Sequence, residues 1–155
     1  MNITIRNAQE KDFPQIIALI KELAVFEKAE DQVTNSVEQM RAEKDFFKCF
    51  VAEISETKEI VGMALYYFAY YTWVGKSLYL DDLYVKQTYR GYKVGTQLLQ
   101  RLFEVAKAEK CNRVRWQVLD WNKPAVKLYT KMGANLDSGW YNCDFDIRAI
   151  QEIIF

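Results

Sequence analysis

The strongest constraint on this chain is a run from Leu78 to Ala134, in which an apolar strand leads through a glycine-containing turn into an amphipathic helix. The strand carries Asp81-Asp82 near its end, the turn reads YRGYKVG over residues 89–95, and the helix is expected from about 94 to 110. Free backbone N–H groups and the positive end of the helix dipole would both point at a ligand bound there. The run therefore predicts a binding site for an anionic pyrophosphate beside an acidic strand end.

The same run continues into a second strand and a second helix. Val114, Trp116 and Val118 alternate with polar residues, which is typical of a strand. Pro124 fits the first turn of a helix that extends to about Met132, and Gly133 follows it as a C′ glycine. A strand, helix, strand, helix order predicts one parallel strand pair within a mixed α/β sheet.

The remaining elements are predicted from periodicity and capping signals. Asp12 is a plausible N-cap, with Pro14 after it, for a first helix that reaches about Glu27. Ser36 and Gln39 resemble a capping box that opens a second short helix. Strands are expected near residues 3–5, 50–54, 60–70, 78–85 and 140–147, and a short helix over 148–155. At this length, residues 1–155 predict a single domain.

Composition excludes several classes of function. The 21 basic and 21 acidic residues balance, which argues against a nucleic-acid-binding protein that relies on counterion release. No stretch approaches the roughly 18 uninterrupted apolar residues of a membrane helix. The N-terminus lacks a basic region followed by an apolar core, so no signal peptide is predicted. We therefore expect a cytoplasmic protein without a membrane or nucleic-acid partner.

The chain contains no histidine and three widely spaced cysteines, Cys49, Cys111 and Cys143. The absence of histidine rules out a His-based catalytic triad and argues against a zinc site, so no metal is predicted. The cysteines are expected to be reduced thiols, most of them buried. A general base must then be a carboxylate, a tyrosine, a lysine, a cysteine or a bound water.

Two motifs make the chain resemble the GNAT acetyltransferases, a superfamily that uses acetyl-CoA. One is the Arg-x-x-x-x-Gly turn from Arg90 to Gly95, and the other is Asn-x-x-Ala-x-x-x-Tyr-x-x-x-Gly-Ala from Asn122 to Ala134. Within the superfamily the chain is most similar to the diamine acetyltransferases, which include spermidine/spermine and thialysine N-acetyltransferases. That similarity rests on the segments LIKELA (19–24), YYF (66–68), TWVGK (72–76), LYLDD (78–82) and VLDWN (118–122).

The resemblance implies a twisted mixed sheet with splayed parallel strands 4 and 5, helices on both faces, and a homodimer. It also implies direct acetyl transfer to a primary amine, with Tyr129 as general acid and Asp81, through a water, as base. The residues that it assigns to the amine are Phe26, Glu27, Trp73, Asp81 and Asp82. The residues that it assigns to acetyl-CoA are Leu83, Tyr84, Val85, Arg90, Gly91, Tyr92, Lys93, Val94, Gly95, Thr96, Asn122, Pro124, Ala125, Tyr129 and Lys131.

The chain departs from this pattern at three positions. Lys93 replaces a glycine of the turn, where its N–H is available to a phosphate only if its φ is negative. Asp81 replaces a glutamate, and Tyr71 replaces an aspartate two residues before Trp73. Because losing a carboxylate weakens binding of a long polycation, the change at Tyr71, together with the VLDWN run, favours a thialysine-type substrate.

Other interpretations of the same residues remain open. The acceptor amine is also compatible with an antibiotic or a protein N-terminus, and a CoA-binding module without turnover would carry many of the same motifs. Taken singly, Asp81 and Asp82 fit a solvated strand end, Tyr129 a core tyrosine, and Trp73 a loop anchor.

Overall fold

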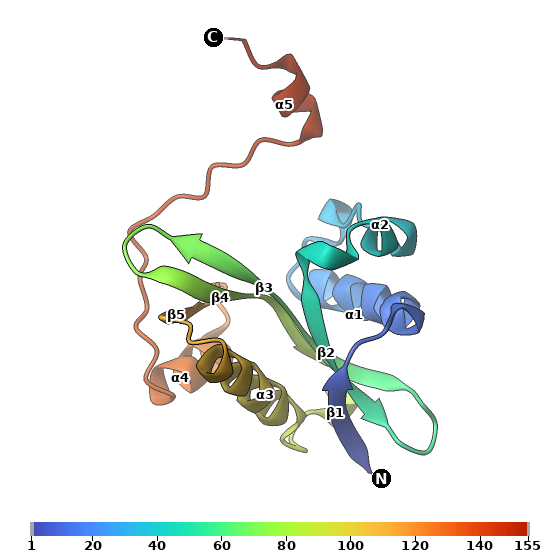
Figure 1. The fold of residues 1–155 in the computed structure, drawn as a ribbon. Helices are drawn as coiled ribbons and strands as arrows, with labels where there is room; N and C mark the ends of the chain where they lie inside the picture. Colours follow the sequence, from blue (N-terminus) through green and yellow to red (C-terminus); the bar gives the residue numbers. More distant parts are fainter. Residues whose placement is uncertain (1, 155) are drawn as a thin grey trace. The chain divides into compact units, whose positions relative to one another are not determined.

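The computed structural model describes residues 2–154 and contains one five-stranded sheet in the order β1-β2-β3-β4-β5 (Figure 1). The first four strands pair antiparallel, whereas β4 and β5 pair parallel. The strands are β1 (Ile3–Asn7), β2 (Lys48–Ile54), β3 (Ile60–Tyr71), β4 (Gly75–Val85) and β5 (Arg113–Arg115). The predicted mixed sheet with one parallel pair is confirmed.

The helices fall into two compact units of the chain, Met1–Gln117 and Val118–Phe155. The α-helices of the first unit are α1 (Phe13–Phe26), α2 (Val37–Ala42) and α3 (Val94–Ala108), and those of the second are α4 (Lys123–Lys131) and α5 (Ile147–Glu152). Short 3₁₀ turns lie at Glu10–Asp12, Glu30–Gln32, Lys44–Phe46 and Gln87–Tyr89.

Helices cover both faces of the sheet in the first unit (Figure 1). Met63 and Val51 are buried in a cluster with Ile16 of α1. Gly62 points the other way, since a Cβ built on it would lie 3.4 Å from Cδ1 of Leu98 in α3. Because side chains alternate along a strand, α1 and α3 pack on opposite faces, as predicted.

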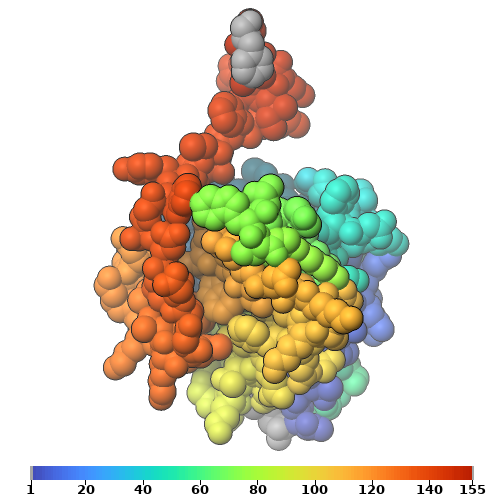
Figure 2. Space-filling model, turned by 60° about the vertical axis from the view of Figure 1, so that its left-hand side comes forward, coloured from blue at the N-terminus to red at the C-terminus, as the bar shows by residue number. Residues whose placement is uncertain are grey.

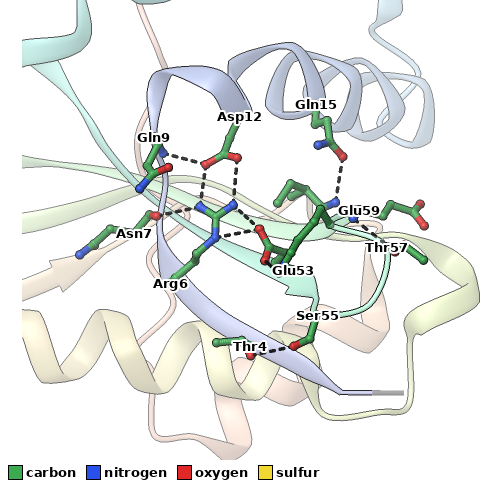
Figure 3. Close-up of polar contacts among 12 residues, drawn as sticks. Thr4, Arg6, Asn7, Gln9, Asp12, Gln15, Glu53, Ser55, Thr57 and Glu59 are labelled. Atoms are coloured by element: carbon green, nitrogen blue, oxygen red, sulfur yellow. Dashed lines mark hydrogen bonds and ion pairs between the residues drawn. The ribbon is translucent and has the colours of Figure 1, made fainter.

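An ion-pair network joins β1, β2 and the start of α1 (Figure 3). Nη1 and Nη2 of Arg6 donate to the two carboxylate oxygens of Asp12 at 2.7 and 2.9 Å, and Nε of Arg6 donates to Glu53 at 3.0 Å. Asp12 also accepts from the backbone N–H of Gln9 at 2.7 Å. The Arg6 hydrogen bonds lower the pKa of the buried Asp12 carboxyl. Asp12 thus occupies the predicted N-cap position of α1, but its side chain makes no cap hydrogen bond to that helix.

Capping chemistry accounts for the other helix boundaries. Ser36 Oγ accepts from the backbone N–H of Gln39 at 3.1 Å, which confirms the predicted start of α2. Gly133 follows α4 with φ +94°, in the left-handed region that a C′ glycine adopts.

The C-terminal segment differs from the prediction. Residues 133–146 form an extended, irregular connection between α4 and α5, so the strand expected over 140–147 is wrong (Figure 2). The physical reason lies in Asp146, whose Oδ1 accepts from the backbone N–H of Ala149 at 2.8 Å and starts α5. The tail helix is thereby confirmed, and β5 is shorter than the expected 114–118 strand.

Within residues 2–154, no helix is both long and apolar enough to cross a membrane.

Candidate active site

The acidic pair of β4 lies at a break in the strand register. Leu65 of β3 pairs with Asp82, and the next residue, Tyr66, pairs with Leu80. Asp81 is therefore the extra residue of a β-bulge, a feature that re-aims a side chain and disrupts the local ladder. Asp82 lies on the face of Leu65, which packs against the cluster that contains α1.

Three carboxyl groups come together at this bulge. Burial raises the pKa of Asp82 to about 7, with further contributions from the charges of Asp81 and Glu27. Partial burial also raises the pKa of Asp81, although this residue keeps an exposed surface, and the pKa of Glu27 just after α1. Such a cluster attracts an ammonium group, because a cation relieves the repulsion among the carboxylates.

Phe26 and Arg90 meet beside the C-terminal end of α1. The Cζ atom of Arg90 lies 5.4 Å from the ring centroid of Phe26 and 5.6 Å from that of Tyr84. Arg90 Nε donates to the carbonyl of Val85 at 3.1 Å. Phe26, Tyr84 and Arg90 border an open cavity of about 470 Å³. The structure thus brings a predicted amine-contact residue against the first residue of the predicted phosphate turn.

The turn before α3 is built from left-handed residues. Gly91 has φ +86°, and Lys93, the N-cap of α3, has φ +61°. The condition of a negative φ at Lys93 is not met, so the lysine adopts a conformation that costs a non-glycine residue about 1–2 kcal/mol. The backbone keeps the shape of a glycine turn, and Val94 opens the helix as predicted.

One edge of β4 is unpaired beyond the parallel ladder. The ladder joins β4 to β5 only from Ser77–Arg113 to Tyr79–Arg115. Beyond Tyr79, no strand of the described chain continues along this edge, where Leu83 and Val85 lie half-buried. The side chain of Tyr84 projects from the face of the sheet opposite to that of Leu83 and Val85, and its phenol donates to Glu22 at 3.2 Å. The parallel pairing of β4 with β5 therefore ends before the acidic pair.

The second unit presents the other motif on one short helix. Asn122 is the N-cap of α4, and its Oδ1 accepts from the backbone N–H of Ala125 at 3.4 Å, while Pro124 occupies the first turn. Ala125 and Tyr129 are four residues apart and share one helix face. Burial raises the pKa of Tyr129, and Lys131 in the last turn is exposed.

The hairpin between β3 and β4 carries the remaining predicted site residue. Trp73 is 85% exposed at the tip of this hairpin, where it packs into no core and is available to a ligand. Two residues before it, the ring of Tyr71 lies against two guanidinium groups, with Cζ of Arg113 at 5.1 Å and Cζ of Arg115 at 5.0 Å.

Comparison with known proteins identifies the family. The Acetyltransferase (GNAT) family matches residues 5–134. The chain is 42% identical to thialysine N-epsilon-acetyltransferase of Sus scrofa, over 98% of this chain and 97% of the relative. It is 36% identical to spermidine/spermine N(1)-acetyltransferase-like protein 1 of Homo sapiens, over 88% of this chain and 21% of that protein.

The chain is a GNAT acetyltransferase. Its fold agrees with that of a Trypanosoma brucei acetyltransferase, with a TM-score of 0.75 at 20% identity over 93% of this chain and all of the other.

Two features of this GNAT acetyltransferase were not among the predicted site residues. The amino-acid sequence around Asp81 does not mark the bulge, because the bulge arises from the pairing of β4 with β3. The basic pair Arg113 and Arg115 was visible as alternation around Val114, but sequence alone did not place it against Tyr71.

Substituting Lys93 by glycine is expected to stabilise the protein by about 0.5–1 kcal/mol, because relief of the left-handed backbone outweighs the extra flexibility of glycine. Lys93→Ala is the matched control, since it removes the charge but keeps the unfavourable φ and should gain nothing. Urea unfolding of both variants measures the effect. Equal stability of the two variants would contradict the backbone argument.

Asp82→Asn is expected to be more stable than the parent at pH 8, with the difference shrinking toward pH 4. The folded pKa of Asp82, about 7, lies above the usual aspartate value of about 3.9, so the folded protein binds more protons between these values. This carboxyl therefore lowers stability as pH rises through that window.

Asp12→Asn provides a control of opposite sign, because the pKa of Asp12 is lowered in the folded protein. It should be less stable than the parent at pH 8, and the deficit should fade as pH drops below about 4. Urea unfolding at several pH values measures both. If the effect of Asp82→Asn on stability did not change with pH, the raised pKa of Asp82 in the folded protein would be refuted.

Proposed function

We propose that this protein transfers an acetyl group from acetyl-CoA to a primary amine of a small diamine or a thialysine-like amino acid. The observation that carries the proposal is the cluster of Asp81, Asp82 and Glu27 at the bulge of β4. A related protein of 42% identity over nearly the full length is named for thialysine N-epsilon acetylation, which supports the same class of acceptor.

The acceptor ammonium is attracted by the carboxyl cluster, and Phe26, next to Glu27, supplies aromatic surface near it, whereas Trp73 lies at the tip of the β3–β4 hairpin. Trp73 is exposed and free to form a cation–π contact. An alkyl ammonium has a pKa of about 10.4, so it must lose a proton before it attacks a thioester. Asp81 accepts that proton through a water, and its raised pKa makes it a better base than an ordinary aspartate.

The residues of the β4 edge and of the turn are suited to hold acetyl-CoA, which supplies the activated acetyl thioester. Backbone groups of Leu83, Tyr84 and Val85 would pair with its pantetheine arm along the unpaired edge. The backbone N–H groups of the turn from Arg90 to Thr96, other than that of Lys93 with its positive φ, and the start of α3 would hold the pyrophosphate. Asn122, Pro124, Ala125 and Lys131 line the cofactor from α4 in this proposal.

Tyr129 donates a proton to the departing thiolate. Transfer from a phenol of pKa about 10 to a thiol of pKa about 8.5 is uphill by about 2 kcal/mol. Burial raises the pKa of Tyr129 further, which keeps the phenol protonated until the thiolate forms. The contribution of this residue therefore depends on its position relative to the leaving group.

Direct transfer of the acetyl group from acetyl-CoA to the amine is favoured over a mechanism that passes through an acetylated cysteine. Burial raises the pKa of Cys49 to about 12, so it holds no thiolate at neutral pH. Neither Cys111 nor Cys143 lies within the Asp81 or Tyr129 motifs. The proposal also includes a single domain over residues 1–155, a homodimer and a cytoplasmic location. Sedimentation of the purified protein tests the homodimer.

The first test is CoA release from acetyl-CoA with a panel of amines: thialysine, lysine, spermidine, spermine, putrescine and an aminoglycoside. We expect turnover with thialysine, exceeding that with spermidine, because Tyr71 removes a carboxylate that would hold a polycation. If no amine of the panel supported CoA release while calorimetry confirmed acetyl-CoA binding, the proposed acceptor class would be refuted.

Tyr129→Phe is expected to lower kcat by roughly 10²–10⁴-fold, the usual contribution of a general acid, with little change in the Kd of acetyl-CoA. Steady-state kinetics and calorimetry measure the two quantities. Tyr141→Phe is the matched control, because Tyr141 is 97% exposed and belongs to no proposed site. A Tyr129→Phe variant that turns over like the parent would remove Tyr129 from its role.

A further inference from the structure

Arg113 and Arg115 form a basic site at the hairpin end of the sheet. Both guanidinium groups lie against one ring, that of Tyr71, at 5.1 and 5.0 Å. Within residues 2–154, neither arginine forms an ion pair with a carboxylate. Arg115 is exposed and Arg113 half-buried, so their N–H donors remain available to an anion.

The basic site shares a sheet face with Asp82. Arg115 pairs with Tyr79 in the parallel ladder, and Tyr79 pairs with Tyr67, whose ring stacks on it at 5.3 Å. Tyr67 lies two residues beyond Leu65, the partner of Asp82. Since alternate residues of a strand share a face, Arg115, Tyr79 and Asp82 project to the same side.

Electrostatics supports this arrangement. Burial is the main cause of the raised pKa of Tyr79, the charge of Asp81 raises it further, and the charge of Arg115 lowers it. Charges of both signs therefore act on the Tyr79 phenol. The stacked tyrosine pair forms an aromatic floor between two ends of opposite charge.

The spacing of the two ends fits a short amino acid. Ser77 and Tyr79, the partners of Arg113 and Arg115, precede Asp81 by four and two residues, which is about 13 and 7 Å along a strand. A lysine-like chain separates its terminal nitrogen from its α-carbon by five single bonds, about 6–7 Å when extended. A hydrogen bond of about 3 Å at each end extends this reach to about 12–13 Å. A ligand of this length would span the acidic and basic groups.

We propose that Arg113 and Arg115 bind the α-carboxylate of an amino-acid acceptor whose terminal amine lies at Asp81 and Asp82. This inference rests on the proposed function and narrows its substrate to zwitterionic amino acids with a terminal amine. An aspartate in place of Tyr71 would instead pair with these arginines and neutralise them, leaving room for a second cationic end of the ligand.

The test compares thialysine with its decarboxylated counterpart, bis(2-aminoethyl) sulfide, in kcat/KM. The parent enzyme should prefer thialysine, and the Arg113→Gln/Arg115→Gln double variant should lose roughly 10–100-fold of that preference, mostly through KM. Arg115→Lys should retain part of it. Arg101→Gln is the control, because Arg101 lies on α3 in an ion pair with Glu104.

A substrate change repeats the test without altering the protein. Thialysine amide, which lacks the carboxylate charge, should show a KM raised by a similar factor with the parent enzyme. Equal kcat/KM for thialysine and its amide, or an unchanged preference in the double variant, would overturn the arginine site while leaving acetyl transfer intact. Absence of turnover with every amine would instead refute the proposed function itself.

Discussion

The break in register between β3 and β4 is the feature on which the rest of the candidate site depends. Without the extra residue at Asp81, every side chain from Asp82 onward would exchange faces, because a one-residue slip inverts a strand. Tyr84 would then leave the α1 side and its bond to Glu22. The bulge thus keeps Asp82 and Tyr84 on the face of α1 while it frees Asp81 from the regular ladder. One inserted residue adapts a structural strand to carry an acidic pair.

The end of the parallel ladder has an equally direct consequence. Because β4 and β5 pair only as far as Tyr79, different groups are available for binding on either side of that residue. On one side, paired strands bring Arg113 and Arg115 against Tyr71. On the other, β4 has backbone groups without a strand partner, followed by the turn at Gly91 and the start of α3. The sheet therefore separates a basic end from a backbone edge, with the carboxyl cluster between them.

Sequence patterns predicted the parts of this structure that local physics determines. The boundaries of α3, the Ser36 cap and the glycine after α4 each depend on a few neighbouring residues. The bulge at Asp81 and the contact of Arg113 with Tyr71 depend on pairing between distant segments, which single-residue periodicity does not encode. The strand expected over residues 140–147 was wrong because Asp146 caps a helix, so a side-chain oxygen competes there with a strand ladder. The sequence predicted that Lys93 lies in a turn before a helix. It did not predict the positive φ of Lys93, because the turn and not the lysine imposes that conformation.

The absence of histidine gives the carboxyl cluster its importance for proton transfer. With a pKa of about 7, Asp82 is about half protonated at neutral pH when no ligand is bound. Asp81, Asp82 and Glu27 then carry less than their full negative charge, since repulsion between neighbouring carboxylates favours a shared proton. Arrival of an ammonium reverses this balance, because a cation lowers the pKa of nearby carboxyls and releases the proton. Binding of an ammonium would thereby ionise Asp82, so that the carboxyl cluster becomes fully charged only when a cation is in place.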